Sequence, residues 1–269
     1  MARRALRAAW ARAYVRAVAA NRELSWLFFD VALPVLASAG YVYVYRALGA
    51  PETYVAFVAL GGAMTAYWLN VLWNMASQLF WEKQSGNLEA YLVAPAPLMA
   101  LLAGMATGAL IQTTLRAVAI VAAAVLWFDV PLAVQDPVGL AGAFLVTMVA
   151  LYGLGMVMAS LFLVHGREAW PLSLMLQEPG YLASGFYFPV RALGFWLTAA
   201  ASVIPLTLGL DAMRQSLYGP EVAMAVLPVR VEVAILAGLA ALFTWAAWRV
   251  LAWMERRARA EGRLTLRWQ

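Results

Sequence analysis

The chain has 269 residues, of which 65% are hydrophobic and 12% charged, and its mean hydropathy is +0.76. Soluble domains carry about 45–50% apolar and about 25% charged residues, so this composition excludes a soluble protein. It predicts an all-α integral membrane protein in one domain, residues 1–269. There is no cysteine, which excludes disulfides and thiolate metal sites. We interpret the net charge of +5 as a topology signal and as contact with anionic lipid rather than with nucleic acid.

The first predicted element is a basic helix over residues 1–23. It has no compact apolar core followed by a small-residue cleavage site, so we expect it to be retained. The spacing of its arginines against its large apolar residues predicts an amphipathic helix lying in the membrane interface. A flank that only orients the first span is an open alternative. The arginines are Arg3, Arg4, Arg7, Arg12, Arg16 and Arg22, and the apolar residues are Leu6, Trp10, Tyr14 and Val15.

Six long apolar runs follow. A hydrocarbon core of ~30 Å needs about 20 apolar residues in a helix, and each run comes close to that length or exceeds it. The sequence therefore predicts six transmembrane helices. They are Leu24–Tyr45, Thr53–Trp81, Leu98–Phe128, Val138–Val164, Trp170–Phe188 and Val231–Met254.

The segment Ala192–Leu210 is also apolar and is nearly long enough to cross. Both the N-terminal helix and the tail over residues 255–269 are rich in arginine, which predicts that both chain ends are cytoplasmic and that the number of crossings is even. We therefore expect residues 189–230 to form a re-entrant region on the outer side. Its hairpin would be broken near Pro205 and bounded by Arg191 and Arg214.

Residues 82–97 form a polar segment between the second and third spans, on the predicted cytoplasmic side. Gly86 permits a sharp turn, Asn87 is the predicted N-cap, and Glu89 suits the positive end of the helix dipole. Apolar residues at i, i+3 and i+4 form one face, and Pro95 and Pro97 end the helix. This pattern predicts a short amphipathic helix that docks into a soluble partner; an ordinary capped loop is the alternative. The assigned residues are Glu82, Lys83, Gly86, Asn87, Leu88, Glu89, Tyr91, Leu92 and Pro95.

Several polar residues interrupt the spans, where charges are costly and usually face the bundle or a cavity. Asn70, Asn74 and Gln78 repeat at i, i+4 and i+8, which predicts one stripe on the second span. Asp30, Asn74 and Glu178 are each roughly 10 Å from the cytoplasmic end of their span, so they would meet in one layer. Such residues would form either a wall of a substrate path or interhelical hydrogen bonds. Gln112 and Arg116 also lie within a span, where Arg116 would snorkel or pair inside the protein.

Two blocks resemble the permeases of type-2 ABC exporters. Their cytoplasmic loop after the second span often reads E-x-x-x-G-T-L-E-x-L-x-x-S/T-P. This chain has Glu82, Gly86, Leu88, Glu89, Leu92 and Pro95 in that frame, and departs from it at Asn87 and Ala94. The second block comprises Ser184–Gly185, Phe188–Pro189, Ile204–Thr207 and Leu210–Arg214. In such permeases it closes the fifth span and forms outer re-entrant helices, so the resemblance points to Phe188, Pro189, Pro205, Asp211 and Arg214.

The resemblance implies a permease subunit of an ATP-driven exporter in a prokaryotic inner membrane. Its expected partners are a cytosolic ATPase subunit in two copies, which would carry ATP and Mg²⁺, a second permease chain (the same or different), and membrane lipids. The chain has no G-x-x-x-x-G-K-[ST] loop, so we assign it no cofactor, metal or catalytic residue of its own. Family members export drugs, lipids or lipid-linked glycans, which implies an amphiphilic cargo. The open alternatives are a passive channel and a membrane-embedded lipid-modifying enzyme, for which an Asp30–Glu178 acid pair is conceivable.

Overall fold

The computed structural model describes residues 2–20, 24–94, 96–130 and 134–260, and every regular element in these ranges is a helix, as predicted. In chain order the helices are α1 (Ala2–Ala20), α2 (Leu24–Ala47), α3 (Glu52–Leu69), η1 (Asn70–Met75), α4 (Gln78–Gln84), α5 (Asn87–Val93), α6 (Leu98–Phe128), α7 (Pro137–His165), η2 (Gly166–Ala169), α8 (Trp170–Ala183), η3 (Val190–Leu193), α9 (Phe195–Ala201), α10 (Pro205–Tyr218), α11 (Pro220–Ala223) and α12 (Val229–Ala260).

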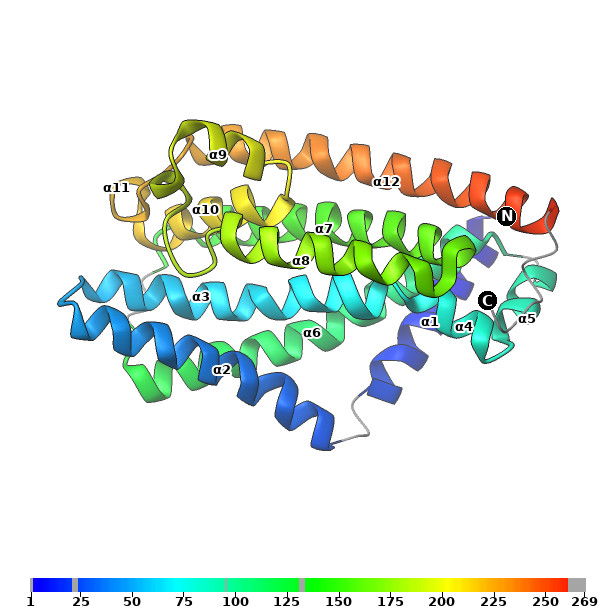
Figure 1. Cartoon of the computed structure of the whole chain (residues 1–269), viewed down its shortest axis with the longest axis horizontal. Helices are drawn as coiled ribbons and strands as arrows, with labels where there is room; N and C mark the ends of the chain where they lie inside the picture. The colour runs from blue at the N-terminus through cyan, green and yellow to red at the C-terminus, as the bar shows by residue number, and fades with distance from the viewer. Residues whose placement is uncertain (1, 21–23, 95, 131–133, 261–269) are drawn as a thin grey trace.

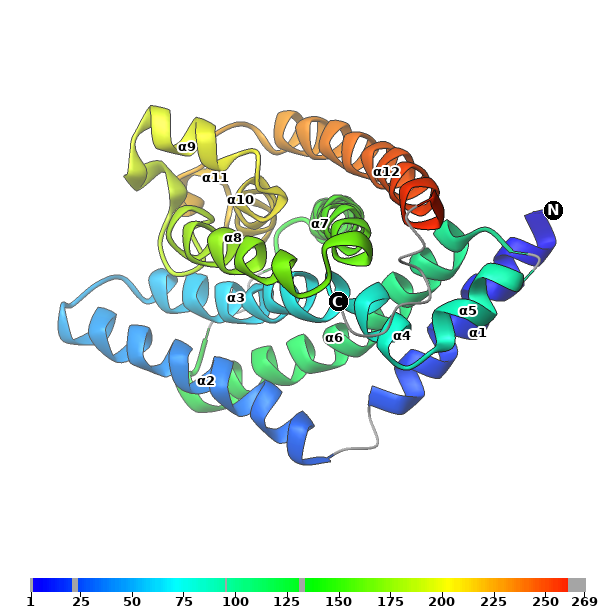
Figure 2. The ribbon, with the colours of Figure 1, turned by 45° about the vertical axis from the view of Figure 1, so that its right-hand side comes forward.

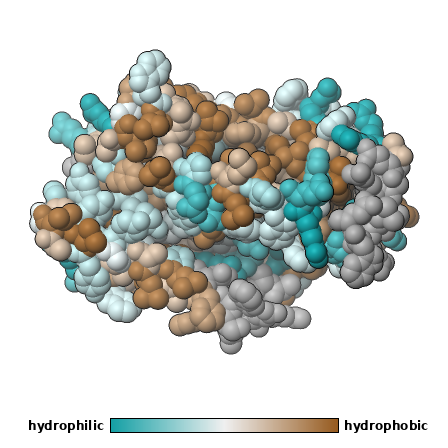
Figure 3. All heavy atoms as spheres, in the orientation of Figure 1, coloured by the Kyte–Doolittle hydropathy of each residue, from teal (hydrophilic) through white to brown (hydrophobic). Residues whose placement is uncertain are grey.

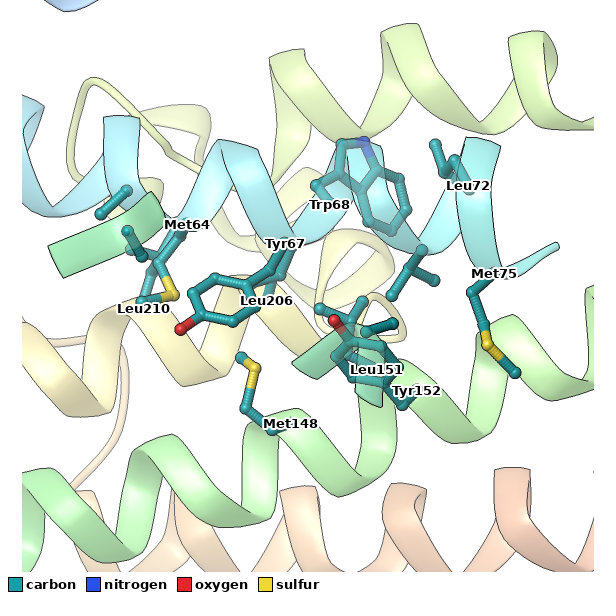
Figure 4. Packing of buried hydrophobic residues seen from close by; sticks show 14 of the residues in the cluster. Met64, Tyr67, Trp68, Leu72, Met75, Met148, Leu151, Tyr152, Leu206 and Leu210 are labelled. Atoms are coloured by element: carbon teal, nitrogen blue, oxygen red, sulfur yellow. The ribbon is translucent and has the colours of Figure 1, made fainter. Parts of the chain in front are cut away.

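Helix α7 occupies the centre of the bundle (Figures 1 and 2). It packs against α12, α10 and η1, while α3 packs against α2 and α6. Large apolar side chains fill the space between these helices because the interior of a helical bundle must be close-packed. Figure 4 shows Tyr67 of α3 facing Met148 of α7, with Leu206 of α10 beside it, while the Trp68 ring lies away from α7 and packs against Gly180 of α8. This core fixes the positions of the long helices relative to one another.

Four helical runs in the described residues are long and apolar enough to cross a membrane: Glu52–Gln84, Leu98–Phe128, Pro137–Ala183 and Val229–Arg257. The bent pair α9 and α10 would make a fifth if it is one span. The structure thus gives a multi-pass helical protein, with four or five candidate spans where the sequence predicted six. Hydrophobic side chains are spread over the face seen in Figure 3, and hydrophilic ones lie at both of its ends and near its middle.

The predicted fifth span, Trp170–Phe188, is longer than the helix that forms there. Helix α8 has 14 residues and ends at Ala183, so it is about 21 Å long, which is less than the ~30 Å of a bilayer core. Gly185 lies just beyond it with φ 67°, a left-handed conformation that ends helices and that glycine adopts without strain. A side chain at Gly185 would also meet Val190 at 2.3 Å. The end of α8 was therefore predicted five residues too late.

The predicted break near Pro205 is present. Helices α9 and α10 are bent by 107° relative to each other, and Pro205 is the first residue of α10, where its missing N–H costs nothing. Arg214 does not bound the hairpin as predicted, because α10 continues to Tyr218 and buries every one of its residues. Helices α9, α10 and α11 lie at one end of the molecule, while α4, α5 and the end of α12 lie at the other (Figure 1).

Candidate functional site

The segment predicted to couple to a partner forms two short helices joined by a glycine turn (Figure 2). Helix α4 ends at Gln84, and Gly86 takes φ 78°, a conformation that glycine adopts without steric cost. The prediction that Asn87 caps α5 is wrong, because the N-cap is Gly86 and Asn87 is the first helical residue. The reversal at Gly86 turns the Asn87 side chain back toward α4, where its amide donates to Glu82 Oε2 over 3.0 Å.

Helix α5 ends where proline restricts the chain. Ala94 precedes Pro95 in the sequence and is extended, with ψ 143°, as expected for a residue before proline. Pro95 itself lies outside the described residues. Leu88 is buried, Tyr91 and Leu92 are half-buried, and Glu89 is exposed. Thus α5 holds Leu88, Tyr91 and Leu92 against the protein, and its exposed side carries polar residues, Asn87 and Glu89, together with apolar ones, Ala90 and Val93.

Glu82 is the centre of this region, and it is buried rather than exposed for docking. Its carboxylate accepts hydrogen bonds from the Gln78 amide over 2.9 Å and from the Tyr91 hydroxyl over 2.8 Å, besides the bond from Asn87. It also forms an ion pair with Arg12 of α1. One carboxylate therefore ties α1, α4 and α5 together. Its neighbour Lys83, also assigned to the partner surface, is buried as well.

Arg12 and Tyr91 complete this network. The Arg12 guanidinium lies 4.9 Å from the centre of the Tyr91 ring, a cation–π contact. Burial, together with the hydrogen bond to Glu82, raises the pKa of Tyr91 above its ordinary value. The phenol is therefore neutral at physiological pH and remains a donor to the carboxylate.

The predicted N-terminal helix forms as α1, but its arginines are divided between two faces. Arg3 and Arg7 are exposed along with Leu6, Trp10 and Tyr14, whereas Arg12 and Arg16 turn toward the protein. Burial lowers the pKa of Arg16 to about 10, so it still carries its charge at neutral pH. Thus only some of the arginines of α1 are exposed and available to bind lipid headgroups.

Small residues let α1 lie directly on α6. A side chain at Gly104 would meet the Ala9 carbonyl oxygen at 2.2 Å, and one at Gly108 would meet the Ala13 carbonyl oxygen at 2.6 Å. Such close backbone approach through small residues is typical of helix packing in membranes. The contact places Arg12 within reach of Glu82.

The region predicted to be re-entrant on the outer side contains Arg214, which is fully buried. Its guanidinium donates to the carbonyl oxygens of Phe57 (3.2 Å), Phe186 (2.9 Å) and Phe188 (3.3 Å), and it lies 4.8 Å from the centre of the Phe57 ring. A single side chain of α10 therefore secures α3 and the loop after α8. Pro189, in that loop, is buried and precedes η3.

Asp211 belongs to a second buried cluster at the same end. It accepts from the backbone N–H of Val226 over 2.8 Å and from the Gln215 amide over 3.2 Å. The same amide donates to Glu232 of α12 over 3.0 Å. Sequence reasoning missed Gln215 and Glu232. Glu232 could have been found from the sequence, because it is a carboxylate in the first turn of the last apolar run.

Comparison with known protein families identifies the family of this chain. The model of the ABC-2 type transporter family matches residues 4–218, which run from α1 to the end of α10. The chain belongs to the ABC-2 type transporter family. No curated protein matches it. Membership makes this chain the membrane-spanning permease component of an ABC transporter, and it implies an ATP-binding ABC subunit as partner.

In this ABC-2 permease, the polar residues of the spans do not form the predicted stripe. Asn70 is buried and accepts from the Tyr152 hydroxyl over 3.2 Å, while Asn74 is exposed and Gln78 bonds to Glu82. The prediction that Asn70, Asn74 and Gln78 form one stripe is wrong, because residues 70–75 form a π-helix. A π-turn holds an additional residue per turn and rotates the next residues of the helix around its axis.

The predicted layer of Asp30, Asn74 and Glu178 can be traced only in part. The side chain of Asp30 lies outside the described part of the structure. Glu178 is exposed on α8 and accepts from the neighbouring Gln177 amide over 3.1 Å. Arg116 and Gln112 are buried in α6, so Arg116 lies within the protein and does not snorkel.

Proposed function

We propose that this permease belongs to an exporter that moves an amphiphilic substrate outward across a prokaryotic inner membrane. Two copies of a cytosolic ATP-binding subunit supply the energy, and a second permease chain completes the pathway. In this proposal the run Pro137–Ala183 crosses the membrane twice, as α7 and as α8, the other three long runs cross once each, and α2 crosses as well. That gives six crossings, with α9 and α10 re-entrant on the outer side and both chain ends in the cytoplasm.

The observation that carries the proposal is the attachment of α5 to the long helices. Glu82 bonds to α5 through Asn87 and Tyr91, and to α1 through Arg12. Helix α4, which holds Glu82, belongs to the same helical run, Glu52–Gln84, as α3. A force on the exposed face of α5 is therefore transmitted to a membrane span, which is what a nucleotide-driven rigid-body transition requires.

The path from α3 continues to α8. The Ser173 hydroxyl donates to the Leu72 carbonyl oxygen over 2.9 Å, within the π-helix. The Trp73 indole N–H donates to the Gln177 side-chain oxygen over 2.6 Å. These bonds join the π-helical turn to α8, so a shift of α3 moves α8 with it. Isolated π-turns within longer helices often occur at functional positions.

The exposure of Glu178 supports a second permease chain. It lies about 12 Å along α8 from Trp170, among exposed apolar residues such as Met175 and Leu182. A carboxylate in a membrane span faces protein or a water-filled path rather than lipid. A second chain covering the α8 face, with an aqueous path between the two, satisfies that requirement.

The test is charge reversal at the exposed position of α5. We expect Glu89→Lys to weaken binding of the ATP-binding subunit that copurifies with the wild-type chain about tenfold, because a like charge opposes an interface built for a carboxylate. ATP-driven transport should fall in parallel, while membrane insertion is unchanged. Glu221→Lys makes the same change at the opposite end of the molecule and should leave both quantities as they are.

Deletion of Gly86–Glu89 is the stronger form of this test. It removes the turn and the start of α5, and we expect it to uncouple ATP hydrolysis from transport while the chain still inserts. Normal transport by the deleted chain would refute the proposed role of α5.

A further inference from the structure

A groove of about 550 Å³ opens between α2, α3 and α8, within the volume range of about 300–1,000 Å³ that is usual for small-molecule sites. Leu33 of α2, Leu69 of α3 and Leu182 of α8 contribute apolar walls. The groove thus lies on α8, the helix that the π-helical turn of the second span holds by hydrogen bonds.

Aromatic rings gather in this groove. Tyr41 and Tyr187 are stacked with their ring centres 4.0 Å apart and their planes 12° apart, and Tyr181 and Phe188 are also among its lining residues. The Tyr45 hydroxyl donates to the Tyr187 carbonyl oxygen over 2.7 Å, which fixes the residue that carries one of the stacked rings. Ring faces attract cations, and the attraction grows when the cation is desolvated.

The charge of the groove has one sign. Glu178 lines it, and none of the described lining residues is lysine, arginine or histidine. The Gln177 amide bonds to one Glu178 oxygen, Oε1, and a carboxylate has further acceptor capacity. The effective dielectric constant near a protein surface is lower than that of bulk water, so a charge close to a carboxylate interacts with it more strongly than in water, and the sign of a ligand's charge matters here.

From these observations we infer that the groove binds organic cations with an apolar body, and that Glu178 selects the sign of their charge. This inference rests on the proposed function and names its substrate class. The apolar body lies against the leucines and the aromatic rings, and the cationic centre lies near the Glu178 carboxylate. Anionic amphiphiles of the same shape are repelled, which disfavours lipid-linked phosphate glycans as cargo.

The experiment compares two probes of nearly the same shape and opposite charge, tetraphenylphosphonium and tetraphenylborate. Binding to the full-length chain in phosphatidylcholine nanodiscs is measured by equilibrium dialysis, with empty discs of the same lipid subtracted. We expect the phosphonium to bind the chain at least about tenfold more tightly than the borate, since tenfold corresponds to only about 1.4 kcal/mol of the electrostatic difference.

Glu178→Gln keeps the size of the side chain and an oxygen that can accept the bond from Gln177, and it removes the charge. It should weaken phosphonium binding about tenfold and leave borate binding unchanged or stronger. The matched control is Glu168→Gln, at an exposed glutamate in η2 that does not line the groove. Equal binding of both probes, no specific binding of either, or full phosphonium binding by Glu178→Gln would each overturn the inference. Unchanged thermal unfolding of Glu178→Gln shows that the comparison is between folded proteins.

The binding assay contains neither ATP nor an ATP-binding subunit. It therefore tests the cation site independently of the coupling role of α5. If Glu89→Lys transports normally while Glu178→Gln loses phosphonium binding, the coupling role of α5 is wrong and the cation site stands. If Glu89→Lys uncouples transport while the two probes bind equally, the coupling role stands and the cation site is wrong.

Discussion

Glu82 shows how one side chain assembles the region that we propose faces the partner. It accepts hydrogen bonds from Gln78, Asn87 and Tyr91 and pairs with Arg12, with its own side chain only 8% exposed. A buried carboxylate is tolerated only when its oxygens are satisfied, and here they are satisfied by groups from three helices. Its role is therefore to position α5, while Glu89 is the carboxylate offered outward.

Glu82→Ala should destabilise the protein by about 3 kcal/mol, because it leaves Arg12 without its carboxylate and three donors without their acceptor. This is the low end of the range for breaking a buried ion pair, since the Arg12 side chain is 22% exposed. Thermal or denaturant unfolding in detergent measures the change. Glu89→Ala, at an exposed position of the neighbouring helix, should stay within about 0.5 kcal/mol of the wild type. Equal effects of the two substitutions would show that Glu82 does not hold the region together.

At the scale of elements, the contact between α3 and α8 depends on Gly180. A side chain there would meet the Trp68 ring at 2.4 Å, and Trp68 is itself fully buried. The contact brings α8 against α3 next to the π-helical turn. It is therefore part of the route by which α5 would move the groove.

Gly180→Ala should destabilise the protein by about 1–3 kcal/mol through overpacking against Trp68. Gly142→Ala in α7 is the matched control, since a side chain at Gly142 would meet nothing within 4 Å. That change should be neutral or stabilise by up to about 1 kcal/mol, because alanine favours helix over glycine. Unfolding curves of the two variants, measured under the same conditions, test this prediction. No loss of stability in Gly180→Ala would mean that α8 packs less closely against Trp68 than described.

Sequence reasoning predicted some elements well and others poorly for physical reasons. The bounds of α6 agree with the predicted span Leu98–Phe128, because the apolar run begins after Pro97 and ends before Asp129. The π-helix at Asn70–Met75 could not be predicted, because no proline or glycine marks it and it depends on packing against α7 and α8. That the Arg12 side chain points into the protein could likewise not be predicted, because it depends on the close approach of α1 to α6 at Gly104 and Gly108.

At the scale of the whole molecule, the polar cluster around Glu82 and the one around Arg214 and Asp211 lie at opposite ends. Helices α1, α4 and α5 meet around Glu82 at one end, and α10, which carries Arg214 and Asp211, lies with α9 and α11 at the other (Figure 1). The proposed function requires that the first end face the cytoplasm and the second face outward. The chain contains no cysteine, so single cysteines can be introduced for labelling without background.

Labelling of Glu89→Cys and Glu221→Cys by a membrane-impermeant maleimide tests this orientation and the docking role of α5 together. We expect Glu221→Cys to be labelled in cells whose outer envelope is made permeable. Glu89→Cys should be labelled only in inverted inner-membrane vesicles, and adding the ATP-binding subunit should protect it. Labelling of both variants from the same side, or labelling of Glu89→Cys that the ATP-binding subunit leaves unchanged, would contradict the proposal that α5 receives the force of ATP hydrolysis from the cytoplasm.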